Sequence, residues 1–161
     1  MKYADIRSQI KSGDVIACGH RGNMFASWYD FKIGMVRVFT RSKYSHVGFA
    51  YVIADRVFIM EAVSSGVRPY PLSLLKDFYL VKRGIWSDDM ERRAFEQCGE
   101  PYSEEDCVDG YFGKEDNDTS HWQCAKYVKY VLQLALRKVT PASVMWQMEE
   151  VEGRHAVFVE T

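Results

Sequence analysis

The sequence has little of what disulfide scaffolds and zinc sites require. Only four of its 161 residues are cysteines, and no two of them form a Cys-x-x-Cys pair. Four cysteines are too few for a disulfide framework at this length. A zinc site needs three or four convergent ligands at recognisable spacing, and none is evident. We therefore expect reduced thiols, no metal and no other cofactor.

The chain also lacks an excess of charge and a long apolar run. Its formal net charge is -1, without a basic tail or stripe, which argues against electrostatic binding of nucleic acid. No apolar run approaches the roughly 20 residues that span a bilayer, and the N-terminus lacks the pattern of a signal peptide. We expect a cytoplasmic protein without stable membrane insertion, and the composition leaves the oligomeric state open.

What is present is enough apolar sequence for one packed domain over residues 1–161, since 47% of the residues are hydrophobic and 14% are aromatic. Hydrophobic periodicity and capping residues predict helices near the two ends and strands in the middle, an α+β arrangement. The predicted strands cover residues 14–18, 45–53, 56–63, 67–71, 79–85 and 155–160. The predicted helices cover residues 5–11, 87–98, 120–138 and 141–150, with a helical turn at 72–77 and at most a short helix at 104–112.

Cys124 lies at the front of the strongest predicted helix, in Trp122-Gln123-Cys124-Ala125. Unpaired backbone N–H groups and the positive end of the helix dipole favour thiolate over thiol at such a position. The same N–H groups can face an oxyanion that forms on an attacked carbonyl. The alternative interpretation is a buried cysteine that packs as a small hydrophobe.

His46 and Glu61 lie on neighbouring predicted strands. A hairpin with the two-residue loop Ala54-Asp55 pairs Ile53 with Arg56 and puts His46 and Glu61 diagonally on one face. An odd loop would put them on opposite faces. Glu61 is the single carboxylate in an apolar run and needs a partner, which a histidine N–H would supply while fixing the imidazole tautomer. An exposed edge-strand glutamate and a structural histidine are the alternative.

Four short motifs together resemble the NlpC-type cell-wall peptidases, which share a papain-like fold. The matching elements are Gly13-Asp14-Val15-Ile16, Ser45-His46-Val47-Gly48-Phe49, Gly99-Glu100-Pro101-Tyr102 and Gln123-Cys124-Ala125. In that family the tyrosine and the cysteine precede the histidine, whereas here they follow it. The chain is therefore similar to a circular permutant, as in the YiiX-like branch. The resemblance implies a central antiparallel sheet or barrel packed against helices, with the nucleophile at the N-terminus of a core helix.

The resemblance also implies roles for four residues: Cys124 as nucleophile, His46 as general base, Glu61 as the group that orients His46, and Tyr102 as a contributor near the oxyanion. It implies a cysteine peptidase or amidase that cleaves a peptide or isopeptide bond, including those of cell-wall peptides, through a covalent acyl-enzyme. The long and acidic interval between Tyr102 and Cys124 departs from the family pattern.

Two other functions fit the same pattern. The first is an acyl hydrolase or acyltransferase acting on lipid esters or amides, with an acyl groove lined by the aromatic residues between Phe25 and Phe39. The second is a non-catalytic protein-binding module on the same fold.

The other candidate ligands do not form recognisable sites. His121 with Cys124, and Cys18 with His20 or Cys107, fall short of the ligands that zinc requires. The acidic residues between 104 and 118 lack the glycine and the spacing of a helix-loop-helix calcium site. His155 has no supporting ligand nearby.

Overall fold

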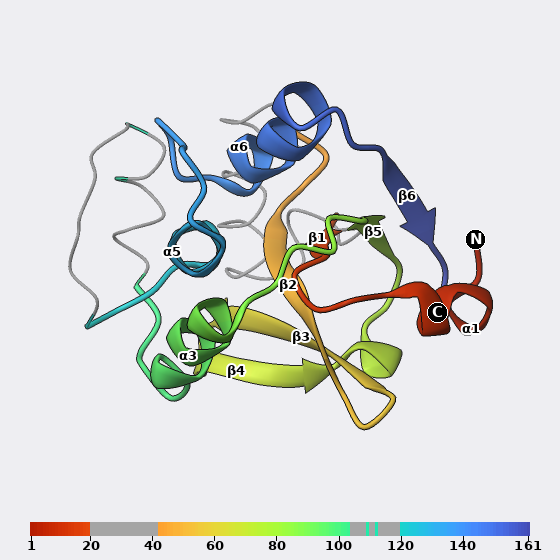
Figure 1. The fold of residues 1–161 in the computed structure, drawn as a ribbon. Coiled ribbons are helices and arrows are strands. Elements are labelled where there is room, and N and C mark those ends of the chain that lie inside the picture. The colour runs from red at the N-terminus through yellow and green to blue at the C-terminus, as the bar shows by residue number, and fades with distance from the viewer. Residues whose placement is uncertain (20–41, 104–108, 110–111, 113–119) are drawn as a thin grey trace, which may run out of the picture.

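The computed structural model describes residues 1–19, 42–103, 109, 112 and 120–161. Their strands form one six-stranded antiparallel sheet in the order β4-β3-β2-β1-β5-β6 (Figure 1). The strands are β1 (Val15–Cys18), β2 (His46–Ile53), β3 (Arg56–Val63), β4 (Gly66–Pro71), β5 (Phe78–Val81) and β6 (Ala156–Val159).

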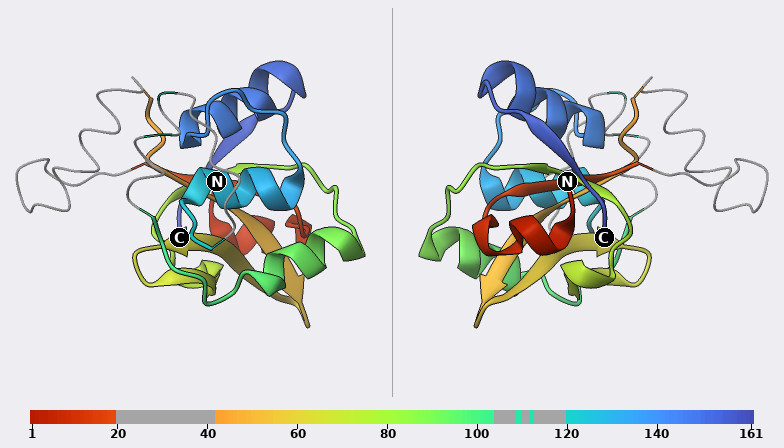
Figure 2. Two further views of the ribbon diagram at one scale, coloured as in Figure 1. Left: turned by 90° about the vertical axis from the view of Figure 1, so that its left-hand side faces the viewer. Right: turned by 90° about the vertical axis from the view of Figure 1, so that its right-hand side faces the viewer.

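The four α-helices of the described residues are α1 (Tyr3–Ile6), α3 (Asp88–Glu96), α5 (Cys124–Leu132) and α6 (Pro141–Trp146). Short 3-10 turns cover Arg7–Gln9 and Leu72–Leu74, and a π-helical turn over Gln147–Val151 follows α6. Helices α3, α5 and α6 lie along one side of the sheet, whereas α1 lies beside the two chain ends (Figures 1 and 2). The mixed α and β arrangement expected from the sequence is confirmed, with the strands in a single sheet of linear order.

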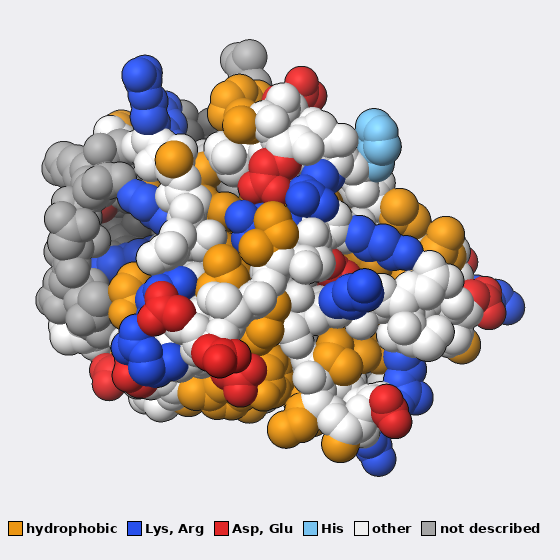
Figure 3. All heavy atoms as spheres, viewed as in Figure 1, with side chains coloured by type: hydrophobic (Ala, Val, Ile, Leu, Met, Phe, Trp, Pro, Cys, Tyr) orange, Lys and Arg blue, Asp and Glu red, His pale blue; other side chains and the backbone are white. Residues whose placement is uncertain are grey.

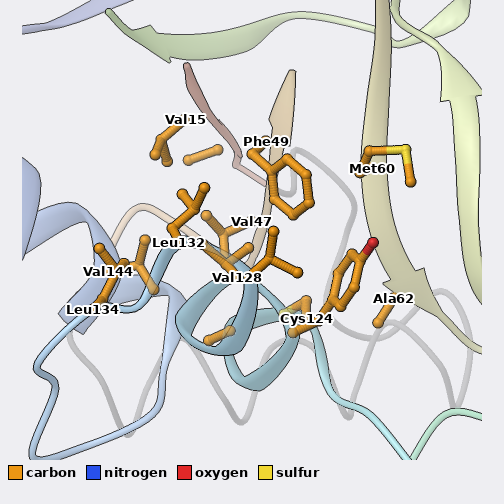
Figure 4. Close-up of a cluster of buried hydrophobic side chains, with 14 of the residues drawn as sticks. Val15, Val47, Phe49, Met60, Ala62, Cys124, Val128, Leu132, Leu134 and Val144 are labelled. Atoms are coloured by element: carbon orange, nitrogen blue, oxygen red, sulfur yellow. The ribbon is translucent and has the colours of Figure 1, made fainter. Parts of the chain in front are cut away.

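The sheet has a hydrophobic cluster on each face, because side chains alternate along each strand. One cluster joins Val47, Phe49 and Met60 to α5 and α6, and Figure 4 shows Val128 and Leu132 directed from α5 toward these strands. The other cluster contains Ile16, Ala50, Ile59 and Leu80, and it is covered by Ile6 of α1 and by Ile10. Each strand residue can thus be assigned to a face from its position in the alternation.

The β2–β3 hairpin has the predicted two-residue loop. Ala54 and Asp55 both have positive φ, at 47° and 59°, which is the backbone of a type I′ turn. Ile53 pairs with Arg56, and the ladder continues to Phe49 opposite Met60. The even-loop register is confirmed.

Several predicted elements are longer than the observed ones, and two of them show why. The helix predicted over 120–138 begins at Cys124 and ends at Leu132, because Gln133 takes a left-handed φ of 54° and stops it. The strand predicted over 79–85 ends at Val81, because the backbone N–H groups of Arg83 and Gly84 turn to the Asp14 carboxylate at 2.8 Å. In both places a local interaction ends the regular structure before the apolar pattern does.

No helix in the described ranges is both long enough and apolar enough to cross a bilayer. On the face seen in Figure 3, basic and acidic side chains are interspersed with apolar ones.

Candidate functional site

Cys124 is the first residue of α5, and the preceding residue, Gln123, is its N-cap. Gln123 has extended backbone, and its side-chain Oε1 accepts from the Ala125 N–H at 2.8 Å. Its Nε2 donates to the Val139 carbonyl at 2.7 Å, so the cap is held from both ends. The Cys124 thiol also donates to Gln123 Oε1, with 3.6 Å between sulfur and oxygen. This cap fixes the thiol at the helix start, where the sequence predicted it.

His46 and Glu61 are in direct contact, with 2.9 Å between His46 Nε2 and Glu61 Oε2. His46 is the first residue of β2, and Glu61 lies near the end of the adjacent strand β3. By alternation both belong to the sheet face opposite α5. His46 is the first residue of its strand, and its imidazole lies close enough to Cys124, at the start of α5, for the thiol to raise the pKa of His46. The structure thus brings Cys124, His46 and Glu61 together.

The electrostatics of this trio favour a protonated imidazole. Burial lowers the pKa of His46, but hydrogen bonding and charge interactions with Cys124 and Glu61 outweigh burial and raise it to about 10. Burial has the opposite effect on a carboxyl group and raises the pKa of Glu61. Hydrogen bonding and charge interactions with His46 and Arg68 outweigh burial and lower the pKa of Glu61 below its usual value. Because Glu61 accepts a hydrogen bond from His46 Nε2, the other ring nitrogen of His46, Nδ1, is available to Cys124.

Arg68 is a member of this cluster that the sequence reasoning missed. It lies directly across from Glu61 in the β3–β4 ladder, and its Nε and Nη2 both donate to Glu61 Oε1, at 3.1 and 3.0 Å. The signal was available, since a second even hairpin loop at Ser64-Ser65 places Arg68 opposite Glu61 as a cross-strand pair of opposite charge.

Tyr102 lies beside the segment that leads into α5. It forms an isolated parallel bridge with Trp122, two residues before Cys124. The Trp122 N–H donates to the Pro101 carbonyl at 2.9 Å, and the Ser103 N–H donates to the Trp122 carbonyl at 2.8 Å. This bridge ties the Gly-x-Pro-Tyr element to the segment that leads into α5, and leaves the role of the Tyr102 side chain a prediction.

Cys18 is a second thiol beside the trio. It is the direct cross-strand partner of His46. Burial, with the charges of Glu61 and Cys124, raises the pKa of the Cys18 thiol to about 12. Cys18 is therefore a protonated thiol at neutral pH, although it lies close to the candidate nucleophile.

The remaining sequence candidates lie elsewhere or outside the described residues. His121 pairs through Nδ1 with Ser120 Oγ at 3.1 Å, and His155 is exposed before β6. No group of three or more His, Cys, Asp or Glu side chains within the described ranges is placed to hold a metal ion. His20, Cys107, the aromatic residues between Phe25 and Phe39 and most of the acidic stretch 104–118 lie outside the described residues.

The Gly13-Asp14 element supports the site indirectly. Asp14 is 1% exposed, and its carboxylate accepts from three backbone N–H groups, those of Lys11, Arg83 and Gly84. Gly13 has a φ of 85°, and a Cβ there would come within 2.1 Å of the Ile85 carbonyl oxygen. The motif thus anchors the start of β1 next to the loop after β5, and so positions the strand that pairs with His46.

Comparison with known proteins supports the fold but not a function. No family model matches the sequence, and no curated protein matches it. Among solved structures, the fold is similar to that of the metalloprotein YiiX from Escherichia coli O157:H7, with a TM-score of 0.57 and 22% sequence identity over 81% of this chain and 69% of that chain. The chain has a YiiX-like fold. At this identity the similarity concerns the fold alone.

Proposed function

We propose that this protein is a cysteine hydrolase of the permuted NlpC-type, papain-like kind, and that it cleaves an amide bond in a peptide or isopeptide. The observation that carries the proposal is the contact of His46 with both Glu61 and Cys124, with the thiol at the first residue of α5. A thiol nucleophile, a base and an orienting carboxylate are the parts that such chemistry requires.

In the proposed reaction the Cys124 thiolate attacks the amide carbonyl carbon while His46 carries the proton. Collapse of the tetrahedral intermediate breaks the carbon–nitrogen bond, and His46 gives its proton to the leaving amine. Water then attacks the acyl-enzyme as His46 removes a proton from it. The sulfur–carbon bond breaks, the acid leaves, and the thiolate and the imidazolium are restored. The products are one acid and one amine.

Stabilisation of the oxyanion falls to the start of α5. The Ala125 N–H is engaged by Gln123 Oε1, so the proposal assigns the oxyanion to the backbone N–H of Cys124 itself. Tyr102 is proposed to contribute from the adjacent bridged segment. Glu61 holds His46 in the tautomer with a proton on Nε2, which leaves Nδ1 facing the thiol.

The description of YiiX as a metalloprotein raises metal binding as another role for this fold. The site of this chain fits that role poorly, because both carboxylate oxygens of Glu61 and the Nε2 of His46 already have protein partners. A metal ion binds neutral or anionic ligand atoms that are free to coordinate it. The positive guanidinium of Arg68, bound to Glu61, would repel a metal cation at this carboxylate. No step of the proposed reaction therefore uses a metal.

Activation of the thiol is tested by alkylation with iodoacetamide at neutral pH, followed by peptide mapping. Cys124 of the folded protein is expected to react at least about tenfold faster than the same residue in urea, and His46→Ala is expected to remove the difference. Cys98, an exposed thiol, is the internal control. Equal rates for folded and denatured Cys124 would overturn the hydrolase proposal.

The bond that is cleaved is tested by mass spectrometry of muropeptides and of lipid extracts, each incubated with the wild type and with Cys124→Ala. A mass change in muropeptides that requires Cys124 supports the peptide amide. A change confined to the lipid extract would replace the proposal with the acyl hydrolase or acyltransferase, and no change in either pool, with a slow thiol, would favour the binding module.

A further inference from the structure

The carboxylate of Glu61 has two cationic neighbours, one on each oxygen. Oε2 accepts from His46, and Oε1 accepts from both Nε and Nη2 of Arg68. The Glu61 side chain is 5% exposed, so its orientation is set by these two partners and not by water. A buried carboxylate with one oxygen unheld can rotate away from an imidazole, whereas one held at the other oxygen cannot do so without losing a charged hydrogen bond.

Arg68 is itself held in place. It lies on the edge strand β4, directly opposite Glu61, and its guanidinium carbon lies 4.9 Å from the centroid of the Tyr70 ring. Its side chain is 44% exposed, so it carries its charge with little desolvation cost. An arginine stacked on an aromatic ring loses less rotamer freedom when it bonds a carboxylate.

The charges of the cluster balance only when Arg68 is included. In the state that the proposed reaction needs, Cys124 and Glu61 are negative and His46 and Arg68 are positive. Cys18, from β1, is a further titratable group on this face, and it is neutral because its pKa is raised to about 12. Without Arg68 the cluster would carry an uncompensated negative charge in a mostly buried place, which is costly.

We propose that Arg68 is a positioning residue of this site: it holds Glu61 Oε1 so that Oε2 stays on His46, and it neutralises the carboxylate so that the thiolate and the imidazolium can coexist. Its effect on reactivity rests on the proposed function, whereas its effect on the orientation of His46 does not. The residue acts through Glu61 and is not assigned a contact with substrate.

The orientation is tested by proton NMR of protein labelled with ¹⁵N-histidine. An imidazole N–H that is held on a buried carboxylate exchanges slowly and resonates far downfield, so the wild type is expected to show this signal for His46. Arg68→Ala is expected to abolish the signal, while Arg68→Lys, which keeps one charged donor, retains it. Arg56→Ala is the matched control, since Arg56 lies on β3 at the far end of the same hairpin. A signal that persists unchanged in Arg68→Ala would overturn the proposal, and so would its loss in Arg56→Ala.

The reactivity is tested by iodoacetamide alkylation of Cys124 across a pH series. Arg68→Ala is expected to lower the rate at neutral pH about tenfold and to move the midpoint of the pH profile upward, with Arg68→Lys intermediate. Urea unfolding of each variant separates this effect from a loss of folding. Failure of the hydrolase proposal would show as a slow thiol in the wild type, and the NMR signal would still decide the role of Arg68.

Discussion

Cys18 and His46 are direct partners across the β1–β2 ladder, so two thiols, Cys18 and Cys124, flank one imidazole. The two thiols differ in their surroundings. Cys18 lies on a strand among apolar side chains, with its pKa raised to about 12, whereas Cys124 lies at a helix start and raises the pKa of His46. The pairing places the proposed nucleophile, Cys124, and a thiol of raised pKa, Cys18, beside the same imidazole, and this contrast can be measured.

We predict that alkylation distinguishes these neighbouring thiols. A thiol with a pKa of about 12 is only about one part in ten thousand thiolate at pH 8, so Cys18 should stay unmodified while Cys124 reacts fully. Time-resolved iodoacetamide labelling with peptide mapping gives both rates in one sample. Modification of Cys18 at the rate of Cys124 would contradict the environments described above.

We predict that stability falls at alkaline pH through His46. Its pKa is raised in the folded protein to about 10 from an ordinary 6.5, so its contribution is fully present below pH 6.5 and is lost as pH rises toward 10. Between pH 7 and pH 10 the free energy of unfolding of the wild type should fall by on the order of 2 kcal/mol more than that of His46→Asn. Urea unfolding at several pH values measures both, and parallel curves for the two proteins would refute the prediction.

We predict that stability also falls at acidic pH, because the pKa of Glu61 is lowered in the folded protein. Its contribution is present above its ordinary value of 4.5 and is lost as pH falls through the folded value. The pair is therefore most stabilising between about pH 4.5 and 6.5. Glu61→Gln should remove the acid-side loss and lower the pKa of His46, which an NMR titration of the His46 ring detects. An unchanged His46 titration would mean that Glu61 does not set it.

We predict that Asp14→Ala destabilises the fold far more than an exposed acidic residue does. The substitution leaves the partly buried backbone N–H groups of Lys11, Arg83 and Gly84 without their acceptor, which should cost about 3 kcal/mol. Asp88→Ala, in the exposed first turn of α3, is the control and should cost less than about 1 kcal/mol. Equal losses in urea unfolding would show that the Asp14 carboxylate does not hold the loop.

We predict that Gln133→Gly stabilises the protein. Gln133 ends α5 with a φ of 54°, a conformation that strains any residue with a Cβ and that glycine adopts freely. The gain should be about 1 kcal/mol, offset slightly by the greater freedom of glycine in the unfolded chain. Gln97→Gly, at the end of α3 with a right-handed φ of -93°, should instead destabilise. The midpoint of thermal unfolding measures both, and a loss at Gln133 would contradict the strain argument.

The part of the site that lies within one hairpin was predictable from sequence. Ala54-Asp55 is a two-residue loop between two apolar runs, so the pairing register and the shared face of His46 and Glu61 follow from alternation alone. The same reasoning applied to the loop Ser64-Ser65 places Arg68 opposite Glu61, so the position of Arg68 was also predictable from the sequence. The ends of α5 were harder, because glutamine is a weak N-cap signal and a left-handed glutamine is an uncommon stop.

The hairpin, the face that His46 and Glu61 share, and the position of Cys124 near a helix start therefore follow from the sequence alone. These are local properties, fixed by strand alternation, turn length and helix boundaries within a few residues. The meeting of the start of α5 with the end of β2, and the entry of Cys18 into the cluster, follow instead from long-range packing. These contacts depend on how α5 packs over β2 and β3 and on how β1 pairs with β2, and they join segments far apart in the chain that no local pattern encodes.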